Sequence, residues 1–213
     1  MTQLADQLLV VVLLLNFVVL ATSRLSVSIR AVALQGILLG FLPSIIHTFS
    51  WHLAAISCGM IIVKGLLIPF LLTRALQRLL VQREPEPFLG YLATLLAGAV
   101  CMAVSFVFAD RLPLAAGHQG LLFVPAAIAT LLIGLLVLVT RRKAVSQVIG
   151  YLVLENGIFI FGQLLTEAMP MMVEAGVLLD LLVGIFVMGI VIGHIKTEFS
   201  SVDTSRLTAL RDT

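Results

Sequence analysis

Charged residues are scarce in this sequence. Only 11% of its 213 residues are Asp, Glu, Lys or Arg, whereas 61% are hydrophobic, and the mean hydropathy is +1.17. About a quarter of the residues of a typical soluble protein are charged, so this chain cannot cover a water-exposed surface. The formal net charge of +2 also argues against a nucleic-acid-binding protein, which concentrates positive charge on one face. The composition therefore predicts an integral membrane protein.

The sequence also has little that would hold a cofactor. Its two cysteines, Cys58 and Cys101, lie in no CxxC or Cys/His pattern, so neither an iron–sulfur nor a zinc site is predicted. A glycine-rich phosphate loop is missing as well. Residues 1–7 contain no Lys or Arg, which favours a retained first span over a cleaved signal peptide. We expect this chain to bind no cofactor or metal and to catalyse no reaction alone.

Long apolar runs fill almost the whole sequence. A helix needs about 20 mainly apolar residues to cross a bilayer, and seven runs reach this length: 5–22, 28–49, 53–73, 88–109, 119–140, 145–166 and 171–195. We therefore predict an all-α, polytopic integral membrane protein with about seven transmembrane helices in a single domain, 1–213.

A faint internal repeat subdivides this domain. The segment that contains Gln35, Gly36 and Ile37 is similar to the segment that contains Asn156, Gly157 and Ile158, as expected of a duplicated unit. This similarity predicts a three-helix unit at 1–82, a linker span at 83–118 and a second three-helix unit at 119–196. A cytoplasmic tail follows at 197–213.

The basic residues predict the orientation of the helices. If the chain crosses the membrane seven times, the same side receives Arg24, Arg30, Arg74, Arg78, Arg83, Arg141, Arg142, Lys143, Lys196, Arg206 and Arg211. The other side receives only Arg111. Because Lys and Arg are enriched in cytoplasmic loops, we expect the N-terminus outside and the C-terminus in the cytoplasm, in a bacterial or archaeal inner membrane.

Four charged residues lie inside predicted spans: Lys64, Glu155, Glu174 and Asp180. An ion at the bilayer centre costs about 2.5–3.5 kcal/mol on insertion scales, so we expect these side chains to face one another, water or a partner subunit. The simplest interpretation is a helix clamp between Lys64 and one acid. That interpretation leaves two acids without a base, and intramembrane carboxyl groups of this kind are typical of a proton path.

Two neighbours of these charges support a functional site. Pro69 has no N–H to donate to the carbonyl of Gly65, so we expect it to weaken the helix next to Lys64. Asn156 adds a polar side chain directly after Glu155.

The last predicted span carries further supporting residues. Gly176 and Gly184 lie one turn before and after Asp180 and permit close helix approach or space for water. His194 lies near the face of Asp180 on an ideal helix, where it would carry protons toward the cytoplasmic side.

Several motifs resemble a known family. The basic turn TRRK (140–143), IGYLVLENGIF (149–159) and MVEAGVLLDLLVGIFVMGI (172–190) resemble the K-type subunit of respiratory complex I and its relatives in cation/proton antiporters. With IIVKGLLIPFLLTRA (61–75) and VDTSRLTAL (202–210) added, the whole chain resembles the component E family of the hydrogenase-4 and formate hydrogenlyase membrane arm.

In K-type subunits, two intramembrane glutamates on consecutive helices form part of a polar axis. Glu174 matches the second of them. The first aligns with Leu152, which precedes Glu155 by one helical turn, about 5.4 Å.

The resemblance implies a non-catalytic membrane subunit of a proton- or ion-translocating redox complex. The implied partners are antiporter-like and quinone-module-like membrane subunits, membrane lipid, and a hydrophilic arm that holds iron–sulfur clusters and a nickel–iron site. Two alternatives stay open. One is a scaffold that joins antiporter-like subunits to the hydrophilic arm. The other is a subunit of a sodium/proton antiporter without a redox arm.

Overall fold

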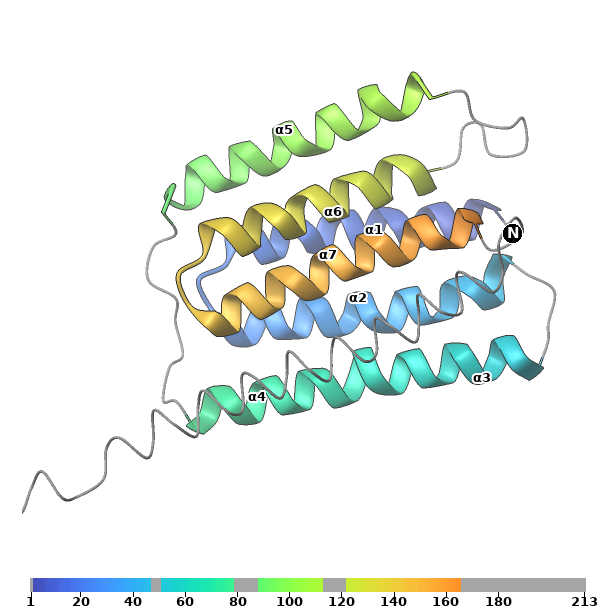
Figure 1. Ribbon diagram of the computed structural model, residues 1–213, viewed down its shortest axis with the longest axis horizontal. Coiled ribbons are helices and arrows are strands. Elements are labelled where there is room, and N and C mark those ends of the chain that lie inside the picture. Colours follow the sequence, from blue (N-terminus) through green and yellow to red (C-terminus); the bar gives the residue numbers. More distant parts are fainter. Residues whose placement is uncertain (1, 47–50, 79–87, 113–121, 166–213) are drawn as a thin grey trace, which may run out of the picture.

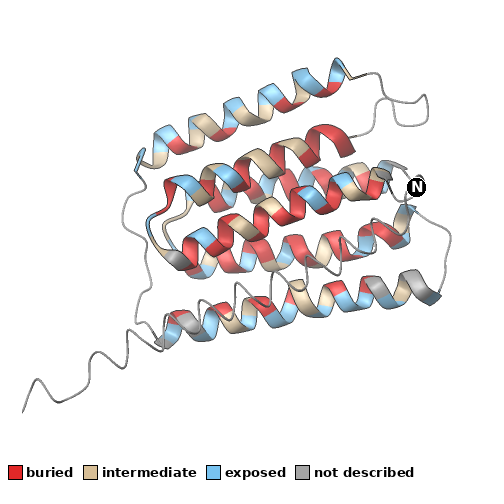
Figure 2. Cartoon of the chain, viewed as in Figure 1, coloured by how far each residue is buried: buried red, intermediate tan, exposed pale blue. Residues whose placement is uncertain are grey.

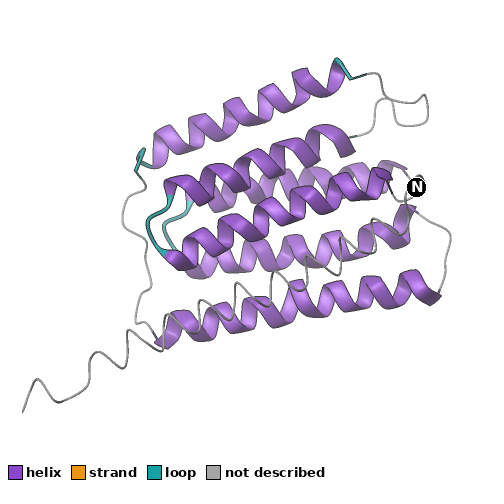
Figure 3. Cartoon of the chain, viewed as in Figure 1, coloured by secondary structure: helices purple, strands orange, loops and turns teal. Residues whose placement is uncertain are grey.

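The computed structural model describes residues 2–46, 51–78, 88–112 and 122–165. Its elements are α1 (Thr2–Ala21), α2 (Leu25–Ile46), α3 (Trp51–Met60), η1 (Ile61–Leu67), α4 (Ile68–Arg78), α5 (Tyr91–Asp110), α6 (Phe123–Thr140) and α7 (Ala144–Leu165) (Figure 1). The elements α3, η1 and α4 follow one another without a break and form one rod. This part of the chain is helical without strands (Figure 3), which confirms the predicted all-α class.

Six of the described helices are long and apolar enough to cross a membrane. They correspond to the first six predicted runs, with ends that differ by a few residues. The second helix, for example, spans Leu25–Ile46 instead of 28–49. The seventh predicted span, 171–195, and the predicted tail lie outside the described residues.

Four helices form a ring. In it, α1 packs against α2 and α6, and α7 packs against the same two helices. On one flank α5 lies along α1 and α6, and on the opposite flank the α3–η1–α4 rod lies along α2 (Figure 1). Burial is concentrated in the ring, whereas α5 and the rod are more exposed (Figure 2). The large apolar residues that these two elements expose include Leu92, Leu96 and Phe70.

Glycines allow α6 and α7 to pack very closely. A Cβ atom at Gly157 would lie 2.5 Å from the backbone nitrogen of Leu131, and one at Gly150 would lie 2.7 Å from that of Leu138. The two helices therefore touch backbone to backbone. Small residues permit this kind of approach between membrane helices, where packing drives association.

A buried arginine anchors the turn between α6 and α7. Arg141 is only 3% exposed, and its Nη2 donates to the carbonyl oxygens of Leu20 at 3.0 Å and Val19 at 3.2 Å. The last carbonyls of a helix have no partner within that helix, and a cation near them is favourable. Arg141 lies in the predicted basic turn, but the sequence does not predict that it caps α1 inside the protein.

Basic residues gather at one end of the bundle. At this end α1, α4 and α6 finish while α2, α5 and α7 begin (Figure 1). Arg24 precedes α2, Arg74 lies one turn before the end of α4 and Arg142 precedes α7, whereas Arg111 follows α5 at the opposite end. Arg24, Arg74 and Arg142 thus lie at one end of the bundle, in agreement with the prediction that they share one side of the membrane. That this side is the cytoplasmic one remains a prediction.

Candidate functional site

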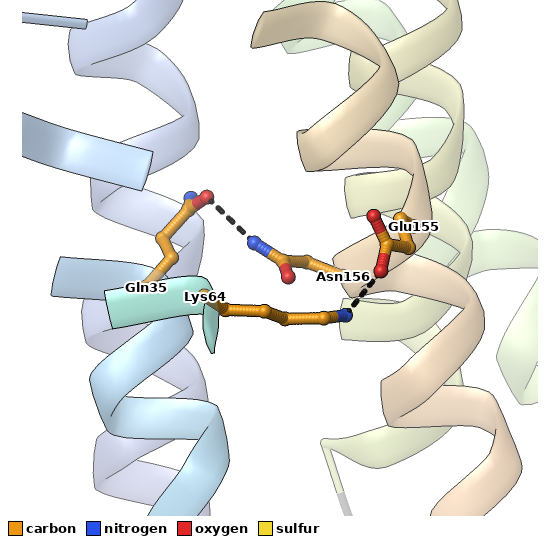
Figure 4. A network of polar contacts seen from close by, with 4 residues as sticks. All are labelled: Gln35, Lys64, Glu155 and Asn156. Carbon is orange, nitrogen blue, oxygen red and sulfur yellow. Dashed lines mark hydrogen bonds and ion pairs between the residues drawn. The ribbon is translucent and has the colours of Figure 1, made fainter. Parts of the chain in front are cut away.

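The site centres on an ion pair inside the helical bundle. Nζ of Lys64, on η1, lies 2.7 Å from Oε1 of Glu155, on α7 (Figure 4). The side chain of Glu155 is 2% exposed and that of Lys64 is 11% exposed. The ring centroid of Phe159, one turn after Glu155, lies 5.6 Å from Nζ. The ammonium therefore has both a carboxylate and an aromatic face as partners, which offsets the cost of burying it.

The lysine is presented by an unusual helix. Lys64 lies in the middle of η1, a π-helix of seven residues, and the N–H of Ile68 donates to the carbonyl of Val63, five residues earlier. Pro69 follows directly and has no N–H to restore the α-helical pattern. The sequence predicted a weakened helix beside Lys64, and the structure shows a widened one. A π-helical turn is rare, occurs mostly as a single bulge within an α-helix, and is frequently found at a functional site.

A close helix contact fixes the backbone beneath this lysine. A Cβ atom at Gly36, on α2, would lie 2.8 Å from Cβ of Lys64 and 3.1 Å from its carbonyl oxygen. No side chain fits between α2 and η1 at this level. The close contact at Gly36 therefore fixes the distance between the backbone of Lys64 and α7.

A chain of neutral polar side chains crosses the ring beside the ion pair. Each ring helix contributes one residue, and none of the four is more than 2% exposed: Asn16, Gln35, Thr130 and Asn156. Asn156 Nδ2 donates to Gln35 Oε1 at 3.4 Å (Figure 4). Gln35 Nε2 donates to Asn16 Oδ1 at 2.8 Å, and Asn16 Nδ2 donates to Thr130 Oγ1 at 2.9 Å. These bonds satisfy polar groups that neither lipid nor apolar side chains can satisfy.

The structure brings several predicted site residues together. Lys64, Glu155 and Asn156 meet in the interior, and Pro69 follows the π-helix that carries Lys64. The predicted residues Glu174, Gly176, Asp180, Gly184 and His194 lie outside the described residues, so their roles stay predictions.

The rest of the polar chain was not predicted to be part of a site. Gln35 was predicted only as a member of the internal repeat, and no role was predicted for Asn16 or Thr130. The available signal was weak: a single amide or hydroxyl in an otherwise apolar run. Such residues are tolerated in membrane helices far better than charges are.

Comparison with known proteins places this chain in a family. No family model matches the sequence. The uncharacterized protein Rv0085 of Mycobacterium tuberculosis is 34% identical over 189 residues, which cover 86% of this chain and 85% of that protein. Hydrogenase-4 component E of Escherichia coli K12 is 33% identical over 158 residues, which cover 73% of this chain and 72% of that protein. The chain belongs to the hydrogenase-4 component E family.

The predicted resemblance to the component E family is thus confirmed. No solved structure matches this chain. This component E family member has an ion pair between Lys64 and Glu155, with a hydrogen-bonded chain across the ring beside it.

Proposed function

We propose that this component E family member is a non-catalytic subunit of a hydrogenase-type redox complex in the inner membrane, related to complex I and to formate hydrogenlyase. Its relative in Escherichia coli is named as a component of hydrogenase-4. We further propose that Lys64 and Glu155 belong to the proton path or coupling axis of that complex. The observation that carries this proposal is a buried ion pair whose lysine lies on a π-helix.

The pair has two states that differ only in the position of one proton. In one state Lys64 is an ammonium and Glu155 a carboxylate, and in the other both groups are neutral. A separation of 2.7 Å is a charge-assisted hydrogen-bond distance, so transfer of a proton between the two groups would need no rearrangement of either helix. In an interior of low dielectric, a charge that changes nearby shifts the balance between the two states strongly.

The predicted continuation of this axis lies in the last span. Glu174 and Asp180 would exchange protons or charge with Glu155, His194 would connect them to the cytoplasmic side, and the glycines at 176 and 184 would leave room for water. Antiporter-like and quinone-module-like membrane subunits would receive the signal. The redox reaction itself would take place in a hydrophilic arm, where other chains hold iron–sulfur clusters and a nickel–iron site.

The experiment is a Glu155→Gln substitution in the native complex, with proton translocation measured in inverted membrane vesicles and normalised to electron flux from formate or hydrogen. Glutamine keeps the size of the side chain and removes its proton chemistry. We expect a complex that assembles and turns over but moves fewer protons per electron. An unchanged ratio at normal turnover would refute the proposal.

A scaffold role is the second candidate, and the same ion pair favours it, because the pair ties η1 to α7. If the pair only holds helices together, Glu155→Ala prevents assembly of the complex, and Glu155→Gln leaves the proton-to-electron ratio of every assembled complex unchanged. The amount of assembled complex on a native gel, measured beside the ratio, separates the two functions.

A further inference from the structure

The polar chain across the ring has a fixed direction. Gln35 Nε2 donates both to Asn16 Oδ1 and, at 3.2 Å, to the backbone carbonyl oxygen of Val12. A carbonyl oxygen accepts hydrogen bonds and never donates them. The nitrogen of Gln35 must therefore face α1, and its oxygen must face α7. One backbone carbonyl decides which way this amide is turned.

The orientation of the Gln35 amide determines the orientation of the other two amides in the chain. Because Asn16 Oδ1 accepts from Gln35, Asn16 Nδ2 is the atom that faces Thr130 Oγ1. Because Gln35 Oε1 faces α7, only the nitrogen of Asn156 can bond to it. All three amides thus donate in the same sense, from α7 through α2 and α1 to α6. Hydrogen bonds aligned in this way polarise and strengthen one another.

The chain ends beside the ion pair. Asn156 follows Glu155 directly in α7, and Figure 4 shows its nitrogen directed at Gln35, with the ion pair on its other side. The amide of Asn156 therefore presents its oxygen, the negative end of the aligned dipoles, away from Gln35. At the same level of α2, Gly36 holds the backbone of Lys64. The adjacent residues Gln35 and Gly36 thus contact both elements that carry the pair. Gln35 bonds to Asn156 on α7, and Gly36 packs against Lys64 on η1.

We propose that Thr130, Asn16 and Gln35 are positioning residues for the Lys64–Glu155 pair. They hold the amide of Asn156 in one orientation, and this orientation sets the balance between the charged and neutral states of the pair. The inference rests on the proposed function of that pair. It adds that Thr130 on α6 and Asn16 on α1 tune proton coupling through a hydrogen-bonded chain.

The sequence permits a clean test of the chain itself. Asparagine occurs only at positions 16 and 156, so the full chain labelled with ¹⁵N-asparagine in lipid bilayers gives two side-chain amide signals, which Asn16→Ser assigns. Thr130→Val keeps the shape of the side chain and deletes the acceptor, whereas Thr130→Ser keeps the acceptor. We expect Thr130→Val to shift both signals and Thr130→Ser to leave the Asn156 signal at its parent position.

A matched control lies on the same helix. Thr140 is also buried, but its hydroxyl donates to the carbonyl oxygen of Leu136 in its own helix. Thr140→Val should therefore leave both asparagine signals in place. If Thr130→Val shifts the Asn16 signal alone, the chain does not transmit its orientation and the inference is wrong. If Thr130→Val does not accumulate, Thr130→Ala replaces it in the same comparison with the same two outcomes.

The effect on coupling is measured in the complex. We expect Thr130→Val to lower the ratio of protons to electrons about two-fold, the scale of a modest interaction within a shared network, and Thr130→Ser to restore the parent ratio. A Thr130→Val complex with the parent ratio, beside a Glu155→Gln complex with a lowered ratio, overturns this inference and leaves the proposed function standing. A parent ratio in the Glu155→Gln complex overturns the proposed function, and with it this inference.

Discussion

Lys64 on η1 and Glu155 on α7 form an ion pair, with 2.7 Å between Nζ and Oε1, and both side chains are largely buried. Removing one partner of such a pair leaves an uncompensated buried charge, whereas removing both leaves none. The pair should therefore behave very differently under single and double substitution.

We expect Lys64→Met and Glu155→Leu each to lower the free energy of unfolding by about 3–5 kcal/mol, because each strands a buried charge. The double variant should recover most of this loss and yet remain unable to couple proton movement to electron flow. The free energy of unfolding is measured in mixed micelles for the parent, both single variants and the double variant. These four values form one thermodynamic cycle, which gives the interaction energy between the two side chains. Strictly additive losses would mean that the two side chains do not interact.

Gly36 should tolerate no side chain. Its Cβ atom would lie 2.8 Å from Cβ of Lys64, so Gly36→Ala must push η1 away from α2, at a cost of about 1–3 kcal/mol. Gly59, on α3, has nothing within 4 Å of the corresponding position. Gly59→Ala should therefore be neutral or stabilising by up to about 1 kcal/mol, since alanine favours a helix. Equal thermal stability of the two variants would contradict the close contact.

Arg141 should matter far more than its neighbour in sequence. Arg141→Ala removes a buried cation and its hydrogen bonds to the end of α1, for which we expect a loss on the order of 3 kcal/mol. Arg142 is exposed and lies 4.4 Å above the ring of Phe88, a contact worth about 0.5–1 kcal/mol at an exposed site. Melting temperatures of the two alanine variants in detergent check the difference, and similar values would rule out the capping role of Arg141.

Pro69 should maintain the π-helix. Pro69→Ala supplies an N–H that can donate to the carbonyl of Gly65 and continue the α-helical pattern, which turns Lys64 away from Glu155. We therefore expect proton coupling to fall although the helix itself becomes more regular. Pro125, near the start of α6, is a suitable control, because a proline there withholds no bond that the helix needs. A Pro69→Ala complex that couples as well as the Pro125→Ala complex would speak against this role.

Much of the architecture could be predicted from the sequence because membrane insertion leaves a strong signal. Runs of about 20 apolar residues have few soluble alternatives, so six spans were predicted nearly in place. The cost of an intramembrane charge likewise singled out Lys64 and Glu155 before any contact between them was known.

Other features could not be predicted, for physical reasons. A proline signals that a helix is disturbed, but it does not specify whether the helix breaks, kinks or widens, and at Pro69 it widens. The bonding of Asn16 to Gln35 and Thr130 depends on how four helices meet, and a lone amide in an apolar run does not reveal its partner. Arg141 was recognised as part of a basic turn, yet its burial depends on the end of α1 lying beside that turn.

The central claim is that Glu155 changes its protonation state as the complex turns over, and redox-induced infrared difference spectroscopy tests it most directly. The parent complex should show a carboxylic-acid C=O band that shifts in heavy water. We expect Glu155→Gln to remove this band and Asp6→Asn, a change outside the ion pair, to retain it. A difference spectrum with the same carboxylic-acid band in the Glu155→Gln complex would contradict the claim.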